Sequence, residues 1–226
     1  MKFNNKIAFL IFADDPYIEA SKKRFAYSAG KKTNLQVSAT LNASITRLTQ
    51  LSGLPAIVIG SDLQHGANFG EKLANAFDFV FQKGYEKVIA VGNDCLELSV
   101  SLLKRAALKI GENEFVYGPS SDGGCYLIGL TRTSFRKDSF AILPWQTQYL
   151  YDALLRYSNS ERSCSMPVLH DLDKEADAFQ SNPSFSLVRV IICLIRSYLK
   201  PAIKNFFLYN FGFLENLFQL RAPPVY

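Results

Sequence analysis

The sequence predicts an α/β fold built on a mixed, mostly parallel sheet. Short apolar runs that suit buried strands alternate with segments of helical periodicity, of which 68–82 is the clearest, and this alternation is typical of βαβ units. Two of the apolar runs, 88–91 and 114–118, lead into acidic turns that contain Asp94 and Asp122. Ligands of open α/β sheets bind outside the carboxyl ends of the strands. We therefore expect Asp94 and Asp122 to share one site.

The remaining elements follow along the chain from the same patterns. Strands are expected at 7–12, 55–60, 88–91, 114–118, 125–130 and 167–173, and helices at 34–50, at 68–82, between 95 and 114, and at 148–157. The pattern also predicts that 13–32 is irregular, that 140–145 is extended and that 158–165 is a polar loop.

Composition indicates a globular protein of one large domain, or of one domain with an appendage. The chain has 226 residues, of which 48% are hydrophobic and 20% charged. Its four cysteines form no CxxC pair, which argues against structural zinc and favours a reducing compartment. The first apolar run is too short for a signal peptide and suits a first strand. We expect a cytoplasmic protein.

Charge divides the chain into an expected body, 1–181, and an apolar, basic helical tail, 182–226. The net charge is +5, and the tail holds five basic residues and one acidic residue, so the body is nearly neutral and is not expected to bind nucleic acid. Arg189, Arg196 and Lys200 would share one face of a helix. Two interpretations stay open: peripheral contact with the inner face of the membrane, or packing against the body or a second subunit in a homodimer. Neither apolar half of the tail is long enough to span a membrane.

Aspartates at strand ends carry the expected chemistry. Asp94 follows one strand, and Asp171 and Asp173 follow another. Such carboxylates can bind Mg²⁺ or Mn²⁺, and the ion can neutralise a diphosphate leaving group. The alternative is that these are ordinary turn aspartates, bonded to nearby backbone N–H groups. Gly123 and Gly124 permit close approach of a ligand to the backbone, or only a tight turn between two strands.

Five motifs, in order, resemble those of a bacterial family of glycosyltransferase-A-like (selenodomain-associated) transferases. That family is similar to the molybdenum-cofactor and phospholactate guanylyltransferases. The motifs are His65-Gly66 through Phe77, Gly92-Asn93-Asp94-Cys95, Gly118 through Leu130, Leu143-Pro144-Trp145-Gln146-Thr147, and Asp171-Leu172-Asp173.

The resemblance implies a glycosyltransferase-A-like, nucleotide-diphospho-sugar transferase fold with three layers, here extended by a C-terminal helical segment. It implies that Asp94 binds the metal ion and that Asp171 or Asp173 approaches it. Asp122, Gly123 and Gly124 would line the sugar or acceptor side. Trp145 would lie nearby, where it could stack on a sugar or base, or simply belong to the core.

The first loop departs from the family's pattern. The family carries a glycine-containing loop that ends in Lys-Thr-Arg, and here Lys22 and Arg24 match the two cations expected to meet phosphates. Glu19 stands at the glycine position, and Asp14 and Asp15 add negative charge, which is unfavourable beside a phosphate.

We therefore expect a metal-dependent transferase that acts on a nucleotide-activated sugar or transfers a nucleotide, with Asp94 and Asp122 as its catalytic residues. Its partners would be a nucleotide or nucleotide-sugar donor and an acceptor that the sequence does not name. The alternative is a catalytically degenerate binding module on the same fold.

Overall fold

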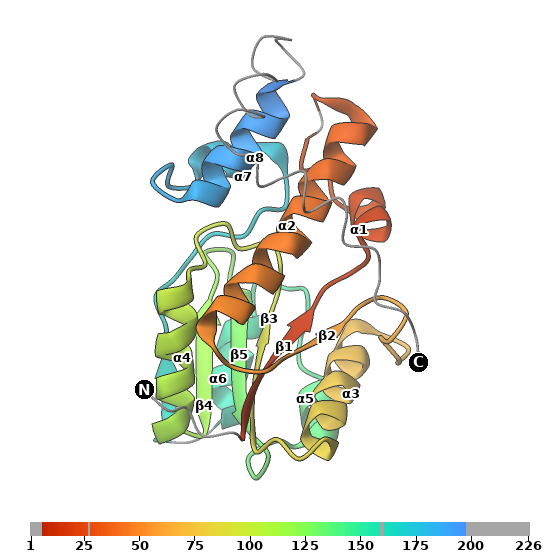
Figure 1. Cartoon of the computed structure of the whole chain (residues 1–226). Helices are drawn as coiled ribbons and strands as arrows, with labels where there is room; N and C mark the ends of the chain where they lie inside the picture. Colours follow the sequence, from red (N-terminus) through yellow and green to blue (C-terminus); the bar gives the residue numbers. More distant parts are fainter. Residues whose placement is uncertain (1–5, 27, 159–160, 198–226) are drawn as a thin grey trace, which may run out of the picture.

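The computed structural model describes residues 6–26, 28–158 and 161–197, which form a six-stranded mixed sheet (Figure 1). The strands are β1 (Ile7–Phe12), β2 (Ala56–Ile59), β3 (Lys87–Val91), β4 (Phe115–Pro119), β5 (Cys125–Thr131) and β6 (Ser163–Ser165). Their order is β2-β1-β3-β5-β4-β6. Neighbouring strands are parallel except at β5, which is antiparallel to both β3 and β4. The mixed, mostly parallel sheet is confirmed.

Helices cover both faces of this sheet and complete three layers. The helices of the described residues are α1 (Pro16–Lys22), α2 (Gly30–Ser52), α3 (Phe69–Gln82), α4 (Val100–Glu112), α5 (Lys137–Ala141), α6 (Leu150–Ser158), α7 (Glu175–Gln180) and α8 (Ser186–Ser197). α2 and α4 pack on one face, and α3, α5 and α6 pack on the other (Figure 1).

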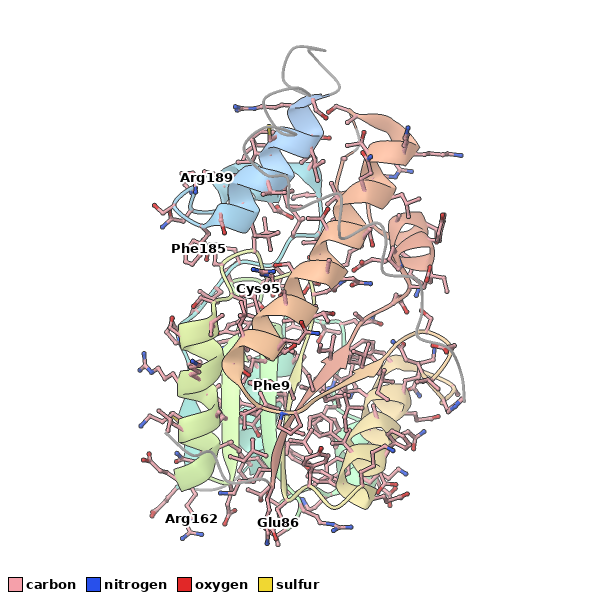
Figure 2. All side chains as sticks on the ribbon, in the orientation of Figure 1. Phe9, Glu86, Cys95, Arg162, Phe185 and Arg189 are labelled. Carbon is pink, nitrogen blue, oxygen red and sulfur yellow. The ribbon has the colours of Figure 1, made fainter. Side chains whose placement is uncertain are left out.

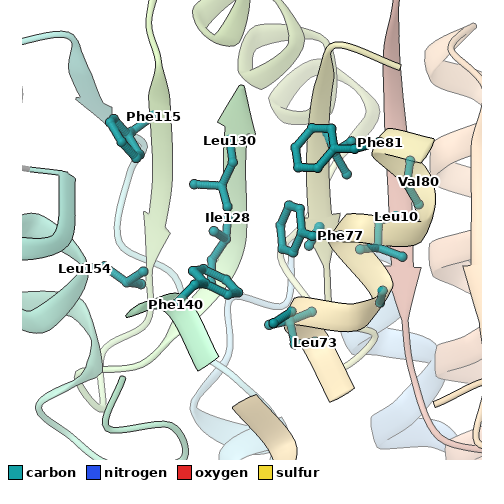
Figure 3. Close-up of a cluster of buried hydrophobic side chains, with 14 of the residues drawn as sticks. Leu10, Leu73, Phe77, Val80, Phe81, Phe115, Ile128, Leu130, Phe140 and Leu154 are labelled. Atoms are coloured by element: carbon teal, nitrogen blue, oxygen red, sulfur yellow. The ribbon is translucent and has the colours of Figure 1, made fainter. Parts of the chain in front are cut away.

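Both faces of the central strands are buried, which explains why these strands read as continuous apolar runs. In β1, Leu10 packs toward α3, whereas Phe9 packs toward α2 and α4. The α3 side is rich in aromatic rings: Phe77 and Phe140 have centroids 5.3 Å apart and meet edge to face (Figure 3). Such contacts add to the free energy gained by burying apolar area.

The expectation of an irregular segment at 13–32 is wrong, because α1 and the first turn of α2 lie there. The Asp15 side chain accepts a hydrogen bond from the Tyr17 N–H as the N-cap, and Pro16 occupies the first turn. Both are signals for a helix start.

Three expectations in the second half of the chain are also corrected. Residues 140–145 are not extended: α5 ends at Ala141 and a turn follows. The polar segment 158–165 contains the short strand β6. Residues 167–173 form no named strand but make isolated bridges, Leu169 with Ser120 and Asp171 with Cys95.

The expected boundary between 181 and 182 lies between α7 and α8, and the described part of the tail is α8. Its apolar residues Val188, Ile191 and Ile195 are buried in a cluster with Leu41 of α2, whereas Arg189 is exposed (Figure 2). No helix in the described ranges is long and apolar enough to cross a membrane. The rest of the expected tail, residues 198–226 with Lys200, lies outside the described residues.

Candidate functional site

A cavity of about 740 Å³ lies where β1 and β3 end and β5 begins. Because β5 runs antiparallel to β3 and β4, its first residues share an edge of the sheet with the carboxyl ends of those strands. Asp94, Asp122, Asp171 and Asp173 all line this cavity. Asp94 and Asp122 thus line one cavity, and their role as site residues stays a prediction.

Backbone pairing brings the two acidic motifs together although they are far apart in sequence. Cys95 and Asp171 form an antiparallel bridge, and the Leu172 N–H donates to the Asp94 carbonyl oxygen at 2.9 Å. Asp171 and Asp173 therefore lie beside the turn after β3 even though no strand carries them.

A tight turn between β4 and β5 holds Asp122 at the cavity. The Gly124 N–H donates to Oδ1 of Asp122 at 2.9 Å, so this carboxylate orders its own turn. Gly123 has φ of 89°, and a Cβ there would lie 2.1 Å from the carbonyl oxygen of Gln148. Gly124 lines the cavity, whereas Gly123 is needed for close packing against the segment before α6.

Lys23 is the centre of the acidic cluster, and the sequence did not point to it. Its Nζ lies 2.6 Å from Oδ2 of Asp94 and 2.8 Å from Oδ1 of Asp173. Burial alone would lower the pKa of Lys23, but the charges of Asp94 and Asp173 outweigh burial and raise it. The lysine is therefore a fixed cation between these two carboxylates.

The two cations expected to meet phosphates differ in position. Lys22 lines the cavity and its Nζ lies 2.5 Å from Oδ2 of Asp14. Arg24 is not among the described residues that line the cavity, and its backbone forms an isolated bridge with Lys174. The lysines at the cavity wall are Lys22, Lys23 and Lys72, the last of which lies in the first motif of the resemblance.

Asp171 is partly buried, as is Asp94, whereas Asp122 and Asp173 are exposed. Burial raises the pKa of Asp171 to about 8, with the negative charge of Asp94 adding to the effect. Its Oδ1 is buried and has no hydrogen-bond partner among the described residues.

The aspartates do not fit a divalent cation as they are arranged. Asp94 and Asp173, two of the three expected ligands, contact the Lys23 ammonium group. Across the described ranges, no three His, Cys, Asp or Glu side chains form a group that could hold a metal ion. A lysine ammonium donates hydrogen bonds and has no lone pair for a metal, so Lys23 competes with an ion for these carboxylates.

Glu19, at the glycine position of the first loop, is buried. Its Oε2 accepts hydrogen bonds from Oγ of Ser38 at 2.5 Å and from Nδ2 of Asn93 at 2.9 Å. Asn93 also donates to Oδ1 of Asn42. This network ties the end of β3 to α1 and α2, so Glu19 has a structural role in addition to its place in the cavity wall.

Trp145, in the fourth motif, is partly buried. Its indole N–H donates to the Phe140 carbonyl oxygen at 3.0 Å, and its ring lies 4.8 Å from the Phe140 ring. Next to it, Gln146 has φ of 60°, which non-glycine residues rarely adopt. Both residues line the cavity, and both belong to the fourth motif of the resemblance.

Comparisons with known proteins agree with this fold. A family profile described as an uncharacterized protein conserved in bacteria (DUF2064) matches residues 63–147. No curated protein matches the sequence.

Several solved structures are similar. A proposed nucleotide-diphospho-sugar transferase from Desulfovibrio desulfuricans G20 is 20% identical, with a TM-score of 0.69 over 85% of this chain and 98% of that chain. A cytidylyltransferase from Leptospira borgpetersenii serovar Hardjo-bovis is 12% identical, with a TM-score of 0.45 over 97% and 99%. Rv0371c of Mycobacterium tuberculosis H37Rv, solved with manganese, is 16% identical, with a TM-score of 0.41 over 77% and 97%. With TM-scores below 0.5, the last two structures resemble this chain only distantly.

The first of these structures shows that the chain shares the fold of nucleotide-diphospho-sugar transferases of the glycosyltransferase-A type. The fold implied by the five motifs is confirmed, and membership of the selenodomain-associated family stays a prediction.

Proposed function

We propose that this protein is a transferase that binds a nucleoside-diphosphate donor in the cavity. It would transfer the sugar or the nucleotidyl group of that donor to an acceptor. The observation that carries the proposal is that lysines and several aspartates line the same cavity. This cavity has a volume of about 740 Å³ and lies at the carboxyl ends of β1 and β3. Small-molecule sites of proteins have volumes of about 300–1,000 Å³, and this position in the sheet is where α/β folds bind ligands.

The lysines are the groups that would meet the diphosphate. Lys22 is paired with Asp14, but its side chain is 61% exposed and can turn toward a ligand. Surface pairs of this kind contribute little stability, so a phosphate can displace Asp14 at low cost. Lys72, from α3, would approach from another side of the cavity. As the bond to the leaving phosphate breaks, these ammonium groups would stabilise the growing negative charge.

Asp122 is our candidate for orienting the acceptor. Its turn is fixed by the Gly124 N–H and by the packing of Gly123 on Gln148, so the carboxylate is held rather than free. A hydroxyl acceptor hydrogen-bonded to Asp122 would lose its proton as it attacks the donor. Gly124 would let the acceptor approach the backbone, and Trp145 would form part of the wall beside it.

A binding module without turnover is the second candidate, and the Asp14–Lys22 pair favours it. Asp14 places a carboxylate beside the cation that would have to stabilise the leaving phosphate, so a ligand could still bind while the charge that grows during transfer is stabilised less. The two candidates agree on ligand binding and differ on turnover.

Trp145 offers a direct test, because it is the single tryptophan of the chain and lines the cavity. Nucleoside diphosphates of each base and their sugar conjugates would be titrated while tryptophan fluorescence and thermal stability are followed. We expect saturable changes with one base, weakened in Lys22→Met, and no fluorescence response in Trp145→Phe although its thermal shift persists. A folded protein that responds to no nucleotide would contradict the proposal. Release of nucleotide on adding candidate acceptors would then separate the transferase from the module.

A further inference from the structure

We infer that the ammonium group of Lys23 is a built-in cation of this site, which occupies the place between Asp94 and Asp173 and lets the protein bind a nucleotide diphosphate without a divalent metal ion. The inference rests on the proposed function only for the part that concerns the diphosphate. Its statement about the two carboxylates stands on the geometry alone.

The first support is the geometry. The Lys23 Nζ contacts Oδ2 of Asp94 at 2.6 Å and Oδ1 of Asp173 at 2.8 Å, so one ammonium group bridges both motifs. The exposed fraction of the side chain is 28% for Lys23 and 24% for Asp94, so water screens this pair less than it screens a surface pair.

The second support is that the backbone of Lys23 is anchored, which fixes where its side chain starts. Lys23 is the C-cap of α1, and its N–H donates to the Glu19 carbonyl oxygen at 2.9 Å. Its own carbonyl oxygen accepts a hydrogen bond from Nδ2 of Asn34, also at 2.9 Å. The lysine therefore enters the cavity from a defined position rather than from a free loop.

The third support is charge balance. The carboxylates of Asp14, Asp94, Asp122 and Asp173 line the cavity, and a diphosphate would add further negative charge to it. Without a cation these groups would repel the ligand. Lys23 supplies a cation between two of these carboxylates, Asp94 and Asp173. A divalent ion bound by Asp94 and Asp173 would have to displace Lys23 or lie against its charge.

Binding of Mn²⁺ alone tests the inference without any nucleotide. Titration of the full chain, followed by the Mn²⁺ paramagnetic signal, is expected to show no saturable binding below about 1 mM, a value at which an interaction is weak. In Lys23→Met or Lys23→Thr the freed carboxylates are expected to bind Mn²⁺ at least about tenfold more tightly, because a neighbouring positive charge is gone. Adding Asp94→Asn to either variant should abolish the gain.

Two results would overturn the inference. One is micromolar Mn²⁺ binding by the wild-type protein that Asp94→Asn removes, because a metal would then bind despite Lys23. The other is a folded Lys23 variant that gains no affinity for Mn²⁺. Two substitutions of Lys23 are used in case one variant does not fold. If neither folds, Mn²⁺ titration of the wild-type protein still tests the inference. Lys137→Met is the matched control, because Lys137 pairs with Asp78 at 2.8 Å on another part of the surface.

A second measurement addresses the diphosphate. Nucleotide binding by the wild-type protein is expected to persist in EDTA, whereas binding by Lys23→Met should become dependent on Mn²⁺. Wild-type binding that disappears in EDTA would contradict the inference. If no nucleotide binds under any condition, the proposed function fails while the Mn²⁺ result for Lys23 stands by itself, so the two failures are distinguishable.

Discussion

Nδ2 of Asn93 lies 2.9 Å from Oε2 of Glu19 and donates a hydrogen bond to it across the junction of β3 with α1. Oγ of Ser38 donates to the same oxygen from α2. Glu19 is 6% exposed, and burial raises the pKa of its carboxyl group above the ordinary value, the two hydrogen bonds opposing this only in part. A carboxylate that is costly to bury therefore holds three elements together at the cavity wall.

The Glu19 carboxyl group should make the protein less stable as pH rises. The pKa of Glu19 is higher in the folded state, so the folded state binds the proton more strongly. The free energy of unfolding therefore falls as pH rises above the ordinary pKa of 4.5, and it stops falling once the pH is above the folded-state pKa. Glu19→Gln keeps an oxygen that can accept both hydrogen bonds and has no charge to bury. We expect its stability to depend less on pH in this window, as measured by urea unfolding between pH 4 and 8.

Glu19→Ala is the control for the hydrogen bonds. It removes the charge and the acceptor together, and leaves Asn93 and Ser38 without this partner. We expect it to lower the free energy of unfolding by about 1–3 kcal/mol at every pH tested, because buried donors lose their acceptor. Equal pH profiles for wild type and Glu19→Gln would show that Glu19 is not the group that titrates.

Gly70→Ala tests the packing of α3 against the turn that carries Trp145. A Cβ at Gly70 would lie 2.0 Å from the carbonyl oxygen of Ala141 and 2.4 Å from Cδ1 of Trp145. Backbone cannot yield at that distance without a shift of the cavity wall, so we expect a loss of about 1–3 kcal/mol and a changed tryptophan emission. Chemical unfolding and fluorescence spectra measure the two effects.

Gly111→Ala is the matched control, because Gly111 also lies in a helix but a Cβ there would meet nothing within 4 Å. Alanine has the higher helix propensity, so this change is expected to stabilise the protein by about 0.5–1 kcal/mol. A Gly70→Ala variant as stable as Gly111→Ala would show that the Ala141 turn moves freely.

Much of the fold was predictable because buried parallel strands and one-sided helices leave strong patterns. β1 was predicted with the bounds that the structure has, Ile7–Phe12, since both of its faces are buried. Residues 140–145 were not, because an aromatic and apolar run suits a strand and a short helix equally well, and tertiary packing around Phe140 decides between them. The antiparallel placement of β5 needs pairing information that local patterns do not contain.

The candidate site was predictable where chemistry follows a strand and unpredictable where it depends on long-range contact. Asp94 and Asp122 each follow a strand, so their meeting at one edge could be inferred. Lys23 meets Asp94 across 71 positions of sequence, and nothing in a basic run of Ser-Lys-Lys-Arg says which lysine turns inward. The C-cap position of Lys23 at the end of α1 decides that, and α1 was not predicted.

Phe140 should be among the most sensitive core positions. It is fully buried, and its ring lies 5.3 Å from Phe77, 4.8 Å from Trp145 and 5.8 Å from Tyr157. Phe140→Ala leaves a cavity in the α3 side of the core, with an expected loss of about 3–5 kcal/mol, whereas Phe140→Leu should cost less because it leaves a smaller void. Thermal unfolding followed by circular dichroism measures both losses. If both variants were as stable as wild type, Phe140 would not be a buried core residue.

The face that α8 turns toward α2 allows a prediction about the tail. Ile191 is fully buried there, and Ile191→Ala is expected to lower the free energy of unfolding by about 2–4 kcal/mol. Arg189 is exposed, so Arg189→Ala should change the free energy of unfolding by less than about 0.5 kcal/mol. A chain that ends at Gln180 would lose α8 and the hydrogen bond from the Asn182 N–H to Oε1 of Glu97, and should be less stable than either variant.

Because removing α8 is expected to destabilise the body, a membrane role of the tail is better tested by charge reversal in the full chain. Val188, Ile191 and Ile195 of α8 are already buried against protein, so this helix offers a bilayer its other side, where the exposed Arg189 and Arg196 lie. We expect α8 not to bind membranes, and Arg189→Glu with Arg196→Glu to sediment with anionic phospholipid vesicles to the same extent as wild type. Loss of sedimentation in the doubly reversed variant, with its stability retained, would instead show that α8 contacts lipid headgroups, since each basic residue near an anionic surface contributes about 1 kcal/mol.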